Sequence, residues 1–130
     1  MYFLDTNICI YFLKGSFVSI RNNLLNTPPN QIRIPVIVHS ELLYGAYKSN
    51  RKSENLQKLQ AFLKPFEIVD YQSHMSETYA EIRTACETSG YSMGPNGLLI
   101  ATITVANHGT LVTRNTKEFG NIPGLKLTEW

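Results

Sequence analysis

Three of the ten acidic residues in this 130-residue chain lie where predicted strands end. Asp5 directly follows the apolar run at the amino terminus. Glu41 lies near the start of the helix predicted after the second strand, and Glu118 lies just past the strand predicted at 110–113. If these strands are parallel neighbours, the three carboxylates converge on one edge of the sheet, where open α/β sheets bind their ligands.

Converging carboxylates repel one another, so they need either a bound cation or a raised pKa. Oxygen ligands of this kind suit Mg²⁺ or Mn²⁺, and the chain has no His or Cys set with zinc spacing. Asp5 taken alone is better explained as a helix N-cap, because "LDTN" suits one. Taken together with Glu41 and Glu118, it favours a metal site. The three histidines lie on different predicted elements and are interpreted as surface or packing residues.

A divalent metal held by carboxylates at the end of a sheet suits phosphodiester cleavage, because it activates a water molecule for attack. Arg114 and Lys117 flank the last acid and can hold phosphate. Side chains able to orient water or ligand oxygens are Thr6, Asn7, Thr113 and Asn115. None of these residues is specific for this chemistry when taken alone.

Strand-like and helix-like segments alternate along the chain, which predicts an α/β fold with a mostly parallel sheet and helices on both faces. The predicted strands cover residues 1–5, 32–38, 66–71, 110–113 and 125–130. The predicted helices cover residues 6–15, 16–27, 39–49, 53–66, 73–90 and 94–109. Ser53 is the predicted cap of the fourth helix, and glycines at 15, 90 and 109 are predicted to end three others.

Composition favours one ordered domain over residues 1–130, with 43% hydrophobic and 17% charged residues. The net charge of +2 permits a nucleic-acid substrate but does not argue for one. We find no signal peptide and no apolar run long enough to cross a membrane. Cys9 and Cys86 lack metal spacing and are interpreted as reduced, buried thiols, so the sequence predicts a cytoplasmic protein.

Three blocks of the sequence resemble the PIN-domain toxins of the VapC type, and the resemblance extends in order over nearly the whole chain. The blocks are "LDTN" at 4–7, "ELLYGA" at 41–46 and "LVTRN…F" at 111–119. The resemblance implies a PIN-like α/β/α sandwich and an Mg²⁺- or Mn²⁺-dependent endoribonuclease that cuts transfer or ribosomal RNA and stops translation. It also implies a homodimer, and a VapB-type antitoxin that inserts a C-terminal segment into the acidic groove.

The resemblance also assigns the site residues by position. The family's first and second acids match Asp5 and Glu41, and its last contribution comes from Asn115 and Glu118 in "TRNTKEF". Its third acid belongs to a "GPND" motif, which in this chain reads "GPNG", so Gly97 stands where an aspartate is expected.

Glycine offers no side-chain oxygen, and the adjacent Asn96 is expected to point about a quarter turn away along the helix. The sequence therefore predicts an intact fold with an inactive or nearly inactive site. One explanation is a disabling substitution that lets cells make a toxic nuclease, which the intact Asp5 and Glu41 favour. The other is a natural non-catalytic relative that binds RNA or an antitoxin.

A DNA nuclease or phosphatase built on the same carboxylates is a weaker third possibility. For the dimer, apolar residues at 16–25 and 53–64 offer an interface, although core packing explains most of them equally well.

Overall fold

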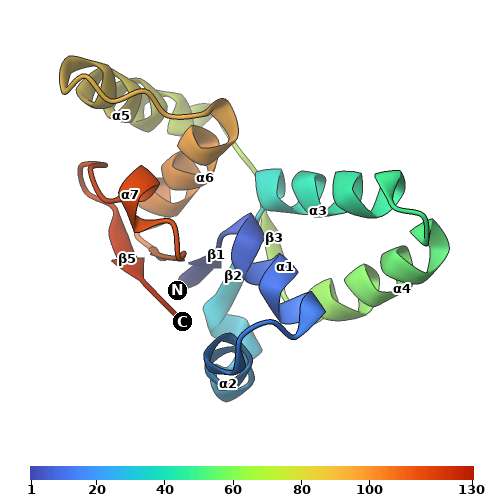
Figure 1. Ribbon diagram of the computed structural model, residues 1–130. Coiled ribbons are helices and arrows are strands. Elements are labelled where there is room, and N and C mark those ends of the chain that lie inside the picture. Colours follow the sequence, from blue (N-terminus) through green and yellow to red (C-terminus); the bar gives the residue numbers. More distant parts are fainter.

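A five-stranded sheet forms the centre of the computed structural model, which describes residues 1–130 (Figure 1). Its strand order is β3-β2-β1-β4-β5, and all four pairings are parallel. The strands are β1 (Tyr2–Leu4), β2 (Ile32–Pro35), β3 (Glu67–Val69), β4 (Thr110–Val112) and β5 (Lys126–Thr128). The predicted α/β fold is confirmed. The chain builds outward from β1 in one direction and then returns to build β4 and β5 on the other side, so the order reverses between β1 and β4.

Each connection between consecutive strands carries one or two α-helices. They are α1 (Thr6–Lys14), α2 (Val18–Asn26), α3 (Val36–Lys48), α4 (Lys52–Leu63), α5 (Ser76–Thr88), α6 (Pro95–Ala106) and α7 (Thr116–Phe119). Short 3-10 turns, η1 (Pro29–Gln31) and η2 (Ser73–Met75), precede β2 and α5. Figure 1 shows the first four helices and the last three gathered on different sides of the strands, as right-handed crossovers require. No helix is long and apolar enough to cross a membrane.

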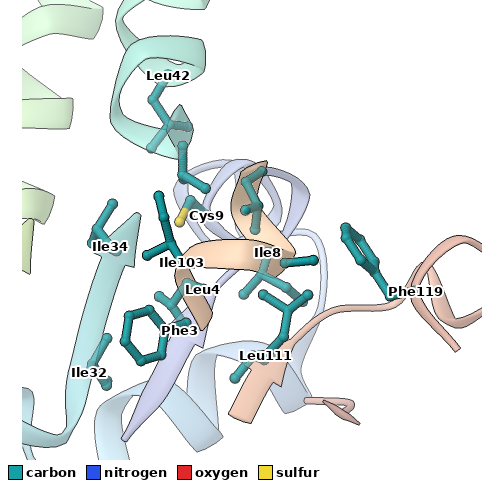
Figure 2. Close-up of a cluster of buried hydrophobic side chains, with 14 of the residues drawn as sticks. Phe3, Leu4, Ile8, Cys9, Ile32, Ile34, Leu42, Ile103, Leu111 and Phe119 are labelled. Carbon is teal, nitrogen blue, oxygen red and sulfur yellow. The ribbon is translucent and has the colours of Figure 1, made fainter. Parts of the chain in front are cut away.

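Side chains from the three central strands meet helix α6 in the core (Figure 2). Leu4, Ile34 and Leu111 have no exposed surface, and burying each contributes about 1.5–3 kcal/mol. Helix α6 is buried over most of its length, which explains its apolar sequence. Its two buried threonines, Thr102 and Thr104, donate hydrogen bonds to carbonyls four residues earlier, so their hydroxyl groups are satisfied. The packing fixes the start of α6 beside the ends of β1 and β4.

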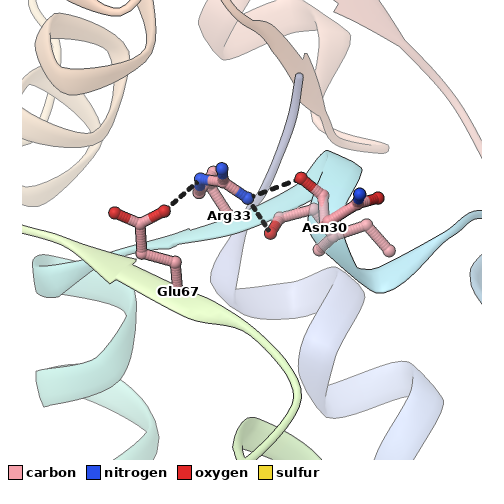
Figure 3. A network of polar contacts seen from close by, with 4 residues as sticks. Asn30, Arg33 and Glu67 are labelled. Atoms are coloured by element: carbon pink, nitrogen blue, oxygen red, sulfur yellow. Dashed lines mark hydrogen bonds and ion pairs between the residues drawn. The ribbon is translucent and has the colours of Figure 1, made fainter.

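A polar contact between β2 and the edge strand β3 supports the alignment of these two strands (Figure 3). Arg33 Nε lies 2.7 Å from Glu67 Oε2, and these two residues are direct partners in the strand register. Arg33 Nη1 also donates to the carbonyl of Asn30 at 2.8 Å. Arg33 therefore links two strands and the turn that precedes one of them.

Several predicted boundaries are wrong. The strand predicted at 32–38 ends at Pro35, because proline has no N–H to continue the ladder, and α3 begins at Val36. Glu41 consequently lies in the second turn of α3 and not at its start. Helix α4 begins at Lys52, so Ser53 is not its cap. The four-residue helix α7 is too short for its pattern to have been recognised in the sequence.

Two of the predicted glycine positions after helices are confirmed and one is wrong. Gly15 and Gly90 adopt left-handed backbone conformations after α1 and α5. After α6 the left-handed residue is His108, with φ 55°, and not Gly109. Gly109 is required for another reason, because a Cβ there would overlap ring carbons of Phe3.

Both cysteines are free and buried, as predicted.

Candidate active site

A cavity of about 290 Å³ opens at the carboxyl edge of the sheet, beside the point where the strand order reverses. Such reversal points are where open α/β sheets bind ligands. Asp5, which follows the end of β1, lies in its wall, and residues on or next to helices α1, α3, α6 and α7 form the rest. The predicted site residues that line it are Asp5, Thr6, Asn7, Glu41, Gly97, Asn115 and Glu118. The fold therefore brings the three acids together on one edge of the sheet.

Asp5 is the most deeply placed of the acids, with 7% of its surface exposed. Its backbone N–H donates to Val112 O at 3.1 Å, which fixes the residue between β1 and β4. Asp5 occupies the predicted N-cap position of α1, and its carboxylate accepts a 2.7 Å hydrogen bond from Thr113 Oγ1. Burial raises the pKa of Asp5, and the hydrogen bond from Thr113, together with the backbone N–H groups of Thr6 and Asn7, only partly offsets this increase. The charge of Glu41 adds to the increase.

Glu41 is held by side chains from two other helices. Thr6 Oγ1, on α1, donates to Glu41 Oε1 at 2.6 Å, and Asn96 Nδ2, on α6, donates to Oε2 at 3.3 Å. Asn96 therefore reaches the site, although a residue next to Gly97 was expected to point away from it. The only sequence signal for this role is its place in "GPNG", one residue before the expected ligand.

Glu118 lies on α7, which is anchored at both sides. Asn115 caps this helix, its Oδ1 accepting from the Glu118 N–H at 3.4 Å and its Nδ2 donating to Glu118 Oε2 at 2.5 Å. Tyr91 Oη donates to the Glu118 carbonyl at 2.6 Å. Partial burial raises the pKa of the Glu118 carboxyl, and the charges of Asp5 and Glu41 raise it further. The charges of Asp5 and Glu41 therefore both act on the carboxyl group of Glu118.

Gly97 lies in the first turn of α6, two residues after Pro95. A Cβ added at this position would lie 2.5 Å from Glu118 Oε1 and 3.2 Å from Met93 Cε. Glu118 Oε1 therefore lies too close to admit a Cβ at position 97, and the Glu118 side chain would have to move if residue 97 were an aspartate.

The remaining predicted residues lie outside the cavity wall. Thr113 is fully buried and lies behind Asp5, where it orients the carboxylate. Arg114 faces away from the site: its Nη2 donates to Trp130 O at 2.7 Å and to Ser19 Oγ at 3.0 Å. Its guanidinium carbon also lies 4.0 Å from the centre of the Phe17 ring. Lys117 is exposed on α7.

The chemistry of this donor set fits a hard divalent cation. Carboxylate, amide and hydroxyl oxygens line the cavity, and these are ligands that Mg²⁺ and Mn²⁺ accept. The nearby thiol of Cys9 is fully buried, and burial together with the Asp5 charge raises its pKa well above the usual value, so it offers no thiolate. No three His, Cys, Asp or Glu side chains already lie close enough to enclose a metal ion. A cation would therefore draw together carboxylates that now interact with Thr113, Thr6 and Asn115.

Comparison with known proteins shows which proteins this chain resembles. The PIN domain family model matches residues 2–125. Ribonuclease VapC2 of Rickettsia felis is 45% identical over 131 residues, covering 100% of this chain and 98% of the relative. The tRNA(fMet)-specific endonuclease VapC of Salmonella typhimurium is 33% identical, covering 99% and 97% respectively.

Solved structures agree with the sequence relatives. VapBC2 from Rickettsia felis, bound to a DNA fragment from its promoter, matches with a TM-score of 0.92 at 45% identity, over 99% of this chain and 98% of that one. DNA-bound VapBC from Salmonella typhimurium also has a TM-score of 0.92, at 32% identity, over 99% and 97%. The predicted PIN-like α/β/α sandwich is confirmed by these matches.

Proposed function

Because the chain belongs to the family of VapC-type PIN-domain ribonucleases, we propose that it is the toxin of a VapBC-type pair. In this proposal it is an Mg²⁺- or Mn²⁺-dependent endoribonuclease that cleaves structured RNA, either transfer or ribosomal RNA, and so inhibits translation. The observation that carries the proposal is the meeting of Asp5, Glu41 and Glu118 around one open cavity at the reversal point of the sheet. Acids at such a position suit metal-assisted phosphodiester hydrolysis.

Asp5 and Glu41 are the residues that would hold the cation. When bound, a divalent cation makes water more acidic and stabilises negative charge on phosphate oxygens. The chain's own contribution is to hold the ligands: Thr113 orients Asp5, while Thr6 and Asn96 orient Glu41. Asn7 lines the same cavity, where its amide can orient water or a phosphate oxygen. Lys117, exposed on the neighbouring helix, is available to bind RNA phosphates.

The proposed protein partners are a VapB-type antitoxin and a second copy of the chain. Large hydrophobic side chains that remain exposed provide surface for such contacts, among them Val18 and Leu25 on α2 and Tyr44 and Tyr47 on α3. The apolar residues of the 53–64 segment contribute less, because Leu59, Phe62 and Leu63 are buried in the core. The VapBC complexes that resemble this chain support an antitoxin as partner.

We propose that Gly97 lowers the activity of this chain by removing one ligand oxygen from the site. The test is Gly97→Asp, with Gly97→Asn as a control of similar size and no charge. The Asp variant should increase Mg²⁺-dependent RNA cleavage by about tenfold or more, and Asp5→Ala in that background should abolish it. Failure of Gly97→Asp to cut RNA with either Mg²⁺ or Mn²⁺ would contradict the proposal.

The second candidate is a non-catalytic protein that binds RNA or an antitoxin. The observation that favours it is Gly97, together with a spacing of the three carboxylates that is too wide to enclose a metal ion. It requires that Gly97→Asp produce no cleavage and that Asp5→Ala leave RNA and antitoxin affinity unchanged. Offering RNA, DNA and a phosphomonoester to the Asp variant also separates a ribonuclease from a DNA nuclease or a phosphatase.

A further inference from the structure

We propose that Glu118 has taken the place of the carboxylate missing at Gly97 and acts as the third acidic group toward the cation in this chain. The inference rests on the proposed function, because it assigns a role within the same site. It concerns two residues on different elements, Gly97 on α6 and Glu118 on α7.

The first argument is spatial. Glu118 Oε1 lies 2.5 Å from the point where a Cβ at position 97 would be, which is closer than two such atoms can approach. Oε1 can therefore occupy this position because residue 97 is glycine and has no Cβ. An aspartate at 97 and Glu118 in its present position exclude each other.

The second argument concerns which oxygen is free. Asn115 Nδ2 donates to Glu118 Oε2, while Oε1 receives no hydrogen bond from the protein. The free oxygen is the one that faces Gly97, inside the cavity that Asp5 and Glu41 also line. Its orientation leaves a free carboxylate oxygen beside residue 97, which is the position of the aspartate in the family motif.

The third argument is that Glu118 is held in place by its backbone. Tyr91 Oη donates to its carbonyl at 2.6 Å, and the Asn115 side chain accepts from its N–H. Because the main chain is anchored, the carboxylate can shift toward a cation by rotation of the side chain alone.

The test is direct measurement of Mn²⁺ binding by titration calorimetry, without RNA. Glu118→Gln should weaken Mn²⁺ affinity by about tenfold or more, because it removes charge while keeping the side-chain shape. Glu118→Asp should weaken it too, since the shorter side chain withdraws from Gly97. Glu77→Gln, an exposed acid on α5, is the control and should leave affinity unchanged. Circular dichroism establishes that each variant is folded.

A double-mutant cycle makes the test specific. In the Gly97→Asp background, the effect of Glu118→Gln on Mn²⁺ affinity should shrink to about threefold or less, because the introduced aspartate then supplies the carboxylate. An equal loss in both backgrounds would overturn the inference, as would unchanged affinity in the single variants or no Mn²⁺ binding by the unmodified chain.

The outcomes also separate the inference from the function. If the effect of Glu118→Gln on Mn²⁺ affinity depends on residue 97 but Gly97→Asp cleaves no RNA, the role of Glu118 is supported and the proposed ribonuclease function is refuted. If Gly97→Asp cleaves RNA but Glu118→Gln leaves Mn²⁺ affinity unchanged, the ribonuclease function is supported and the role of Glu118 is refuted.

Discussion

At the scale of single residues, Asp5 lies in the candidate site, and its buried carboxylate destabilises the fold when it is charged. Its carboxylate is nearly buried, accepts one hydrogen bond from Thr113 and lies in the field of Glu41. A carboxyl in such a place prefers its neutral form, and its raised pKa reflects this preference. The charged form is therefore unfavourable to the metal-free fold, and a cation in the cavity would remove that penalty.

Asp5→Asn should stabilise the metal-free chain at neutral pH. The folded-state pKa of Asp5 is raised, so its ionisation opposes folding at high pH and ceases to do so as the residue is protonated. The gain in Tm should be largest at about pH 7–8 and should shrink as the pH falls toward the ordinary aspartate value of 3.8. Thermal unfolding in EDTA across this range measures it.

Adding Mn²⁺ provides the complementary measurement. It should raise the Tm of the unmodified chain, because a ligand that binds only the folded state stabilises it, and should raise the Tm of Asp5→Asn much less. A variant that is less stable than the parent at neutral pH in EDTA would contradict this account of Asp5.

At the scale of elements, the ends of the helices decide where the site residues point. Gly15 ends α1 with φ 67°, and its N–H donates to the carbonyl of Phe12 at 3.1 Å. This turn sends the chain toward α2 and leaves the start of α1, with Thr6, at the cavity. A left-handed residue at this point favours glycine.

Gly15→Ala should destabilise the chain by about 1–2 kcal/mol, because an L-residue is strained in the left-handed region. Gly45→Ala is the matched control, since Gly45 is inside α3 and a Cβ there meets nothing within 4 Å. It should stabilise the chain by up to about 1 kcal/mol. Urea unfolding measures both changes, and a loss of stability in Gly45→Ala as large as that in Gly15→Ala would refute the conformational explanation.

The sequence could predict the fold class and the meeting of the three acids because both depend on local patterns and on a general rule for parallel sheets. It could not predict the start of α3, since "IRIPVIV" suits a strand throughout and only Pro35 marks the break. The contact of Asn96 with Glu41 and the entry of Glu118 into the space beside Gly97 join residues 55 and 21 positions apart in the chain. Such contacts depend on how α6 packs against α3 and α7.

At the scale of the whole molecule, Arg114 connects α2 to the carboxyl-terminal residue. It follows β4 and reaches both Ser19 on α2 and the carbonyl of the last residue, Trp130. Trp130 in turn packs against Tyr2, with ring centres 5.4 Å apart, and Figure 1 shows the two termini close to each other. The sequence suggested a phosphate-binding role for Arg114 because it is basic and next to the site segment. Its contacts instead assign its guanidinium to holding α2 and the carboxyl terminus.

Arg114→Ala and Lys117→Ala should therefore affect different properties of the chain. Loss of Arg114 should lower the free energy of unfolding by about 2 kcal/mol, because two charge-assisted hydrogen bonds and the contact with Phe17 are removed. Loss of Lys117, which is exposed, should leave stability unchanged within about 0.5 kcal/mol. For transfer RNA bound in EDTA at several salt concentrations, only Lys117→Ala should reduce the salt dependence of affinity, by about one unit of slope. If Arg114→Ala changes that slope with no loss of stability, its guanidinium binds phosphate and the structural role is refuted.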